Sequence, residues 1–75
     1  MSLKRRFGHR LACLRKSRGL TQDQLAERCG VSVDTISNIE RGIHGPRFDL
    51  LESLADSLAV SVTELFIFSD QTLPS

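Results

Sequence analysis

The spacing of apolar positions predicts a first helix over about residues 6–18. Phe7, Leu11 and Leu14 recur at i, i+4 and i+7, which places one apolar stripe along such a helix. Gly19 ends it. Residues 1–5 form either a loose basic arm or an extra first turn. We take them as a flexible basic arm, and we take residues 69–75 as a flexible tail.

Two more short helices are predicted between Thr21 and Arg41. Thr21 is a good N-cap residue, and Gln24 follows three positions later, which is a capping-box pattern. Gly30 favours a stop in the left-handed conformation, and Ser32 can then cap another helix. Ile36 and Ile39 supply the apolar side of that second helix and leave it a polar outer face. The pattern is that of a helix-turn-helix.

A fourth and a fifth helix follow the turn-rich segment 42–46. The fourth helix is expected from about residue 47 or 48 to residue 58, with apolar residues on one face: Phe48, Leu51, Leu54, Ala55 and Leu58. Ser61 and Glu64 then have capping-box spacing, and Val62, Leu65 and Phe66 follow the spacing of a short helix. We therefore expect a compact all-α domain of five helices over residues 6–68.

Length and composition narrow the class of protein. A chain of 75 residues has room for one domain, and 40% hydrophobic with 25% charged residues is ordinary for a globular protein. No apolar run is long enough to cross a membrane, and no signal peptide is recognisable, so a cytoplasmic protein is expected. Cys13 and Cys29 match no metal or redox spacing. We expect no cofactor, no metal and no membrane partner.

The small net charge hides a strong asymmetry. Residues 1–20 contain seven lysines and arginines and no acid, whereas residues 21–75 contain three arginines against nine acids. Such a basic cluster favours a polyanionic partner, with nucleic acid ahead of a membrane surface. The other interpretation is a basic helix that is merely solvated.

The apolar residues Phe66, Ile67 and Phe68 allow two interpretations. A domain this small has little room to bury all three, so they form a candidate homodimer interface. Alternatively, they close the bottom of the core.

Taken in order, the motifs resemble the lambda-repressor-like (Cro/CI, or XRE-type) helix-turn-helix family of phage and bacterial regulators. The resemblance runs from about Phe7 to Phe66 and departs at Ala59, where the family more often has glycine. The motifs that carry it are Leu11-x-x-Leu14-Arg15, Gly19-Leu20-Thr21-Gln22-x-x-Leu25-Ala26, Gly30-Val31-Ser32, Ile36-Ser37-x-Ile39-Glu40-Arg41-Gly42, Pro46 and Leu58-Ala59-Val60-Ser61-x-x-Glu64-Leu65-Phe66.

The resemblance implies that the third helix enters the DNA major groove. The residues that would then face base edges are Val33, Asp34, Ser37 and Asn38. Asp34 is the uncertain member of this set, because a carboxylate near phosphates needs a donor and can instead pair with an arginine. The residues expected near the DNA backbone are Thr21, Gln22, Ser32, Thr35, Arg41 and Arg47. For Arg47, an approach to the minor groove and a merely solvated position at the start of a helix both stay open.

Arg15 and Glu40 have a structural role in the resemblance. The family pairs the arginine of its first helix with the glutamate that ends its third. We therefore expect a partly buried salt bridge that holds the first helix against the recognition helix, with no direct contact to DNA.

Double-stranded DNA is the expected partner, bound by a homodimer on a two-fold operator, and the expected role is transcriptional regulation, most simply repression. The second hypothesis is an antitoxin or adaptor, in which the apolar edge meets another protein, such as a toxin or a second regulator. An enzyme is not expected, because the chain has only His9 and His44 and shows no phosphate loop or catalytic constellation.

Overall fold

Four of the expected helices form, each close to its predicted position. The structure is a computed structural model that describes residues 2–68, and this part of the chain contains helices and loops but no strand. The expected all-α class is confirmed. Its elements, in chain order, are α1 (Leu3–Ser17), α2 (Gln22–Cys29), α3 (Val33–Glu40), α4 (Phe48–Leu58) and the single 3-10 turn η1 (Thr63–Phe66).

The first helix begins earlier than the apolar spacing indicated. The hydroxyl of Ser2 accepts a hydrogen bond from the backbone N–H of Arg5 at 3.3 Å, which caps α1 at its first turn. Of the two alternatives for residues 1–5, the structure has the extra turn for residues 3–5. The predicted tail at residues 69–75 lies outside the described residues. Ser2 was the available signal, since serine is a favoured N-cap residue.

The helix-turn-helix forms with the predicted caps. The Thr21 hydroxyl accepts from the backbone N–H of Gln24 at 3.0 Å, and the Gln24 side chain accepts from the backbone N–H of Thr21 at 2.9 Å. Gly30 ends α2 in the left-handed conformation, with φ 69°. Ser32 caps α3 through the backbone N–H of Thr35. Two capped helices therefore meet across a turn of three residues, 30–32.

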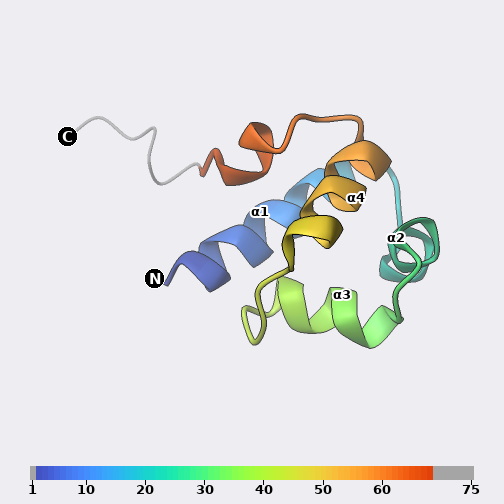
Figure 1. Cartoon of the computed structure of the whole chain (residues 1–75), viewed down its shortest axis with the longest axis horizontal. Helices are drawn as coiled ribbons and strands as arrows, with labels where there is room; N and C mark the ends of the chain where they lie inside the picture. Colours follow the sequence, from blue (N-terminus) through green and yellow to red (C-terminus); the bar gives the residue numbers. More distant parts are fainter. Residues whose placement is uncertain (1, 69–75) are drawn as a thin grey trace.

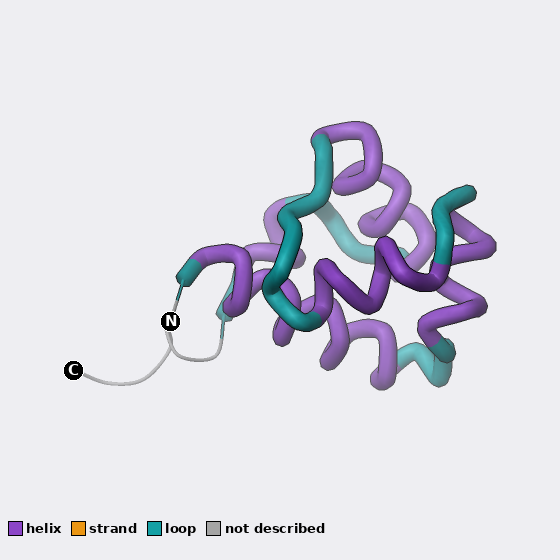
Figure 2. The backbone as a smooth tube through the Cα atoms, turned by 90° about the horizontal axis from the view of Figure 1, so that it is seen from below, coloured by secondary structure: helices purple, strands orange, loops and turns teal. Residues whose placement is uncertain are grey.

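The core lies between the four helices. α3 packs against both α1 and α2, and α2 also packs against α4. Figure 1 shows α3 along the lower edge of the molecule, below α1 and α4, and Figure 2 views the molecule from that lower side. The side chains with essentially no exposed surface come from every element: Leu11, Leu25, Ile36, Ile39, Leu54, Leu58 and Leu65.

Gly8 allows α1 and α3 to approach closely. A Cβ atom at this position would overlap the backbone carbonyl oxygens of Ile39 and Glu40, at the end of α3. Gly8 is itself buried in the middle of the contact. Its place near the start of α1 suggested only a tolerated helix penalty, whereas the structure shows a residue that sets the distance between two helices.

The expected core position of Phe48 is wrong. Its side chain is 86% exposed, although Leu51, Leu54, Ala55 and Leu58 are buried as the spacing predicts. Phe48 is the first residue of α4, and a helical side chain leans toward the helix N-terminus. At the first position that direction carries the ring past the end of the core.

The fifth helix is also wrong, because the segment after Ser61 forms only the 3-10 turn η1. Both hydrogen bonds of the predicted capping box are present, with Ser61 N–H donating to Glu64 at 3.0 Å and Glu64 N–H donating to Ser61 at 3.2 Å. Ile67 is already extended, with φ −88° and ψ 105°. The cap therefore starts a turn that the following residues do not continue.

In the described part of the chain, no helix combines the length and the apolar character needed to cross a membrane.

Ala59 ends α4 in a conformation that glycine adopts more easily. Its φ of 57° and ψ of 43° are left-handed, and among the described residues it is the only one other than glycine with a positive φ. This conformation costs an L-residue about 1–2 kcal/mol, while glycine loses about 0.5–1 kcal/mol in chain entropy.

We predict that Ala59→Gly raises the free energy of unfolding by about 0.5–1 kcal/mol, because it removes the left-handed strain at the end of α4. The midpoint of urea denaturation measures this change. Ala12→Gly is the matched control. It makes the same substitution inside α1 and is expected to lower stability by about 1 kcal/mol. A loss of stability in Ala59→Gly would contradict the explanation.

Candidate nucleic-acid interface

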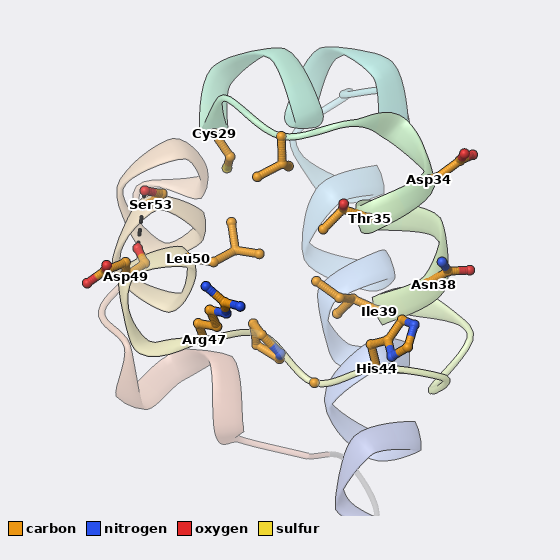
Figure 3. Close-up of a pocket in the computed structure, with 13 residues that line it drawn as sticks. Cys29, Asp34, Thr35, Asn38, Ile39, His44, Arg47, Asp49, Leu50 and Ser53 are labelled. Atoms are coloured by element: carbon orange, nitrogen blue, oxygen red, sulfur yellow. Dashed lines mark hydrogen bonds between the residues drawn. The ribbon is translucent and has the colours of Figure 1, made fainter.

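The outer face of α3 carries the four residues that were expected to read bases. Val33 and Asp34 are exposed, while Ser37 and Asn38 are partly buried. Figure 3 shows Asp34 and Asn38 pointing outward from the side of α3 that faces away from α4. On the opposite side of the same helix, Ile36 and Ile39 are buried in the core. The helix therefore presents a short, mostly polar surface on a rigid support.

Asp34 stays unpaired in this structure. No lysine, arginine or histidine among residues 2–68 forms an ion pair with its carboxylate, so the alternative of an Asp34–arginine pair is not realised here. An ionised carboxylate can only accept hydrogen bonds. On the outer face of α3, Asp34 therefore suits a donor group on the partner and repels a phosphate.

Ser32 and Thr35 have local partners. Their hydroxyl oxygens lie 3.0 Å apart, and the Ser32 hydroxyl also accepts from the backbone N–H of Thr35 at 3.2 Å. Thr35 lines a cleft between α3 and α4, as Figure 3 shows. The expected role of these residues at the DNA backbone thus depends on their position at the start of α3, where backbone N–H groups attract anions.

The cleft between α3 and α4 has a volume of about 590 Å³. Its floor is apolar and includes Val31, Ile39 and Leu50, and its rim includes His44 and the exposed Arg47. Figure 3 shows Arg47 on the loop side of this cleft, across from α3. The cleft therefore brings one arginine near α3 from a different part of the chain.

Arg15 and Glu40 form the ion pair that the resemblance implied. Arg15 Nε lies 2.7 Å from Glu40 Oε2, and Arg15 Nη2 donates to Glu40 Oε1 at 3.0 Å. The side chains are only 10% and 6% exposed. These hydrogen bonds to a carboxylate raise the pKa of Arg15 above its usual value, because they favour the charged guanidinium. A pair with two parallel bonds resists rotation as well as separation.

The pair also connects the start of α2. Arg15 Nη1 donates to the backbone carbonyl of Leu20 at 2.8 Å, and Gln22 Nε2 donates to Glu40 Oε1 at 2.9 Å. A primary amide has two N–H groups, so this bond leaves Gln22 one N–H for a second acceptor. The Arg15–Glu40–Gln22 network therefore links α1, α2 and α3 and holds the Gln22 amide in one orientation.

Several basic residues of α1, and Arg18 at its C-cap, have partners inside the protein. Arg10 Nε donates to the carbonyl of Glu64 at 3.1 Å, and Arg18 Nε donates to the carbonyl of Leu58 at 2.8 Å. The guanidinium of Arg6 lies over the ring of Phe68, 5.5 Å from its centre. The dense basic stretch is therefore neither one continuous surface for a polyanion nor a merely solvated helix face.

The three apolar residues after Leu65 separate. Phe68 is 4% exposed and belongs to the core, while Ile67 is 46% exposed. Phe66 is partly buried, with its ring centre 5.1 Å from that of Phe7 and 6.2 Å from that of Phe68. Within this segment, Phe68 therefore closes the core, whereas Ile67 contributes to the outer surface.

The basic first turn of α1, one of the two alternatives for residues 1–5, also belongs to this region. Lys4 and Arg5 lie against the loop between α3 and α4, next to Gly45 and Gly42 respectively. Of the two alternatives, the apolar spacing favours the loose arm, because it begins only at Phe7. The N-cap residue Ser2 was the signal that a helical turn precedes it.

The comparisons with known proteins agree with this geometry. Residues 6–65 match the model of a family described as a helix-turn-helix domain. A relative from Sinorhizobium fredii, the uncharacterised HTH-type transcriptional regulator y4dJ, is 38% identical over 96% of this chain and 94% of its own. The immunity repressor of Bacillus phage phi105 is 38% identical over 88% of this chain and 44% of its own.

A solved structure supports the same grouping. The restriction-modification controller protein C.AhdI from Aeromonas hydrophila is similar, with a TM-score of 0.82 and 33% identity, over 84% of this chain and 96% of that one. The family and these neighbours are transcription regulators and not enzymes.

We predict that Glu40→Ala lowers the free energy of unfolding by about 3 kcal/mol, because it leaves the buried Arg15 guanidinium without its counter-charge. Urea denaturation followed by circular dichroism measures the loss. Glu52→Ala, at an exposed position of α4, is the control and is expected to change stability by less than about 0.5 kcal/mol. If the two variants unfold at the same urea concentration, the pair does not hold the helices together.

Proposed function

This chain belongs to the helix-turn-helix family of XRE-type transcriptional regulators, and we propose that it binds double-stranded DNA sequence-specifically with α3 in the major groove. The observation that carries the proposal is the outer face of α3. Its side chains project from a helix whose opposite side is buried and whose end is held by the Arg15–Glu40–Gln22 network.

The chemistry of this face suits the edges of base pairs. Asn38 can form two hydrogen bonds with adenine, Ser37 can donate or accept, and Val33 can touch a thymine methyl group. Asp34 can accept from the amino group of cytosine, which fits its lack of an ion pair among residues 2–68. Three polar residues and one apolar residue on two turns of helix are enough to read a few base pairs.

Phosphate contacts are proposed on both sides of α3. On one side, the donors are at the first turns of α2 and α3. They are the backbone N–H groups that follow Thr21 and Ser32, and the second side-chain N–H of Gln22. On the other side, Thr35 borders the α3–α4 cleft, Arg41 ends α3 and Arg47 precedes α4. These contacts would position α3 without selecting a sequence.

A homodimer on a two-fold operator is the second part of the proposal. A single α3 reads few base pairs, whereas two copies about 34 Å apart reach successive turns of the same major groove. The exposed apolar residues at the end of the described chain, Val62 and Ile67, supply the contact surface, with the edge of Phe66 beside them. Phe68 would act from the core by supporting them. Such a dimer would repress by occupying promoter DNA.

We predict that Asn38→Ala weakens binding to a cognate duplex by about 1–3 kcal/mol and relaxes selectivity at one base pair, because a two-bond contact to a base is lost. The probe is a duplex that the unmodified protein enriches from random DNA, and fluorescence anisotropy measures affinity. Glu52→Ala is the control with unchanged affinity. An unmodified protein that enriches no sequence, or whose affinity does not fall as salt increases, would overturn the function.

We predict that Ile67→Asp converts the dimer to a monomer, because a charge then lies in the apolar contact. Light scattering after size exclusion measures the mass. Ile43→Asp is a closely matched control, since Ile43 is 45% exposed in the loop between α3 and α4, and it is expected to stay dimeric. If the unmodified protein is monomeric both alone and on a two-fold DNA site, the proposed homodimer is wrong. Co-purification of a different polypeptide in equal amount would point to the adaptor class.

A further inference from the structure

A second hollow lies at the C-terminal end of α3. Its volume is about 500 Å³, and its lining comes from α1, from the end of α3 and from the loop that follows: Arg5, His9, Glu40, Arg41 and Ile43. Figure 1 shows the N-terminal turns of α1 beside the loop that leaves α3. The hollow therefore adjoins the proposed DNA face and is not part of the α3–α4 cleft.

Gly42 allows the first turn of α1 to lie against this loop. Gly42 has φ 78°, and a Cβ atom placed there would lie 3.0 Å from the Cα of Arg5, which is too close for an ordinary side chain. At Gly45, an added Cβ would lie 3.8 Å from Cγ of Lys4. The extra turn of α1 therefore lies against the loop, which places Lys4 and Arg5 beside the segment that follows α3.

The charge of the hollow is positive. Glu40 is its one carboxylate, and both of its oxygens already accept hydrogen bonds from Arg15. Lys4, Arg5 and Arg41 are exposed, and none of them forms an ion pair with a carboxylate among residues 2–68. This differs from Arg10, Arg15 and Arg18, whose guanidinium groups bond to other elements of the protein.

We propose that this hollow binds a phosphate of the DNA backbone, beyond the base pairs that α3 reads, with Lys4 and Arg5 as contacts that act together with Arg41. The proposal rests on the proposed DNA-binding function and extends it to a site on α1. A phosphodiester can accept charge-assisted hydrogen bonds from several donors at once, and the hollow supplies such donors from α1 and from the end of α3. His9 offers a further ring N–H on the same wall.

The contacts would be independent of base sequence. Each phosphate that a basic side chain neutralises releases counterions, which adds about 0.9 to the slope of log K against log salt. The same relation gives about eightfold in affinity per contact at 0.1 M salt, relative to 1 M. Loss of Lys4 and Arg5 should therefore weaken binding to cognate and unrelated DNA by the same factor.

The test compares the unmodified protein with Lys4→Gln/Arg5→Gln, which removes both charges and keeps the aliphatic stems that pack on Gly42 and Gly45. Arg28→Gln, at an exposed position in the last turn of α2, is the control for net charge. Affinity is measured from 0.05 to 0.5 M salt on the enriched duplex and on an unrelated duplex of equal length. Ethylation of single phosphates maps which ones the protein needs.

We expect the double variant to lose about one phosphate's worth of slope for each protomer, about 0.9, on both duplexes. We also expect it to become insensitive to ethylation at the phosphates that flank the enriched sequence. Arg28→Gln should keep the slope and the ethylation pattern of the unmodified protein. If the double variant keeps an unchanged slope and ethylation pattern while Asn38→Ala still loses selectivity, the proposed phosphate site is wrong. The proposed DNA-binding function then still stands. An unmodified protein that binds neither duplex overturns both.

Discussion

The Arg15–Glu40 ion pair, with Gln22 bonded to the same carboxylate, decides how the three N-terminal helices are placed relative to one another. Arg15 lies near the end of α1, Glu40 ends α3 and Gln22 begins α2, so the network fixes one point on each helix. A buried carboxylate without its guanidinium costs several kcal/mol, and the arrangement therefore has few alternatives of similar energy. The Arg15–Glu40–Gln22 network therefore also sets the orientation of the outer face of α3.

Close packing acts at a second point on the same pair of helices. Gly8 lies in the first half of α1 and meets the carbonyl groups at the end of α3, where any larger residue would separate the helices. The ion pair fixes the orientation of α3 relative to α1, and Gly8 sets the distance between these two helices. Together they place the end of α3 beside the start of α1, and the basic hollow forms at this junction.

The basic residues of α1 and its C-cap Arg18, apart from the exposed Lys16, form two groups with different physical roles. Arg10, Arg15 and Arg18 bond to carbonyl or carboxylate oxygens of distant elements, and Arg6 covers the ring of Phe68. Lys4 and Arg5 lie against the loop between α3 and α4, and Arg5 also lines the basic hollow. A count of charges along the chain cannot make this division, because it depends on which carbonyl groups end near each guanidinium.

The sequence by itself determined the helices, their caps and most of the core, because these follow from interactions within a few residues. The capping boxes at Thr21 and Ser61, the stop at Gly30 and the buried stripe of α4 after Phe48 are all of this kind. Only the tertiary structure decided the remainder. Three features depend on residues far along the chain: whether the turn after Ser61 continues, which of Phe66, Ile67 and Phe68 is buried, and why residue 8 is glycine. Contacts of that kind are set by how the helices pack, and no local pattern specifies them.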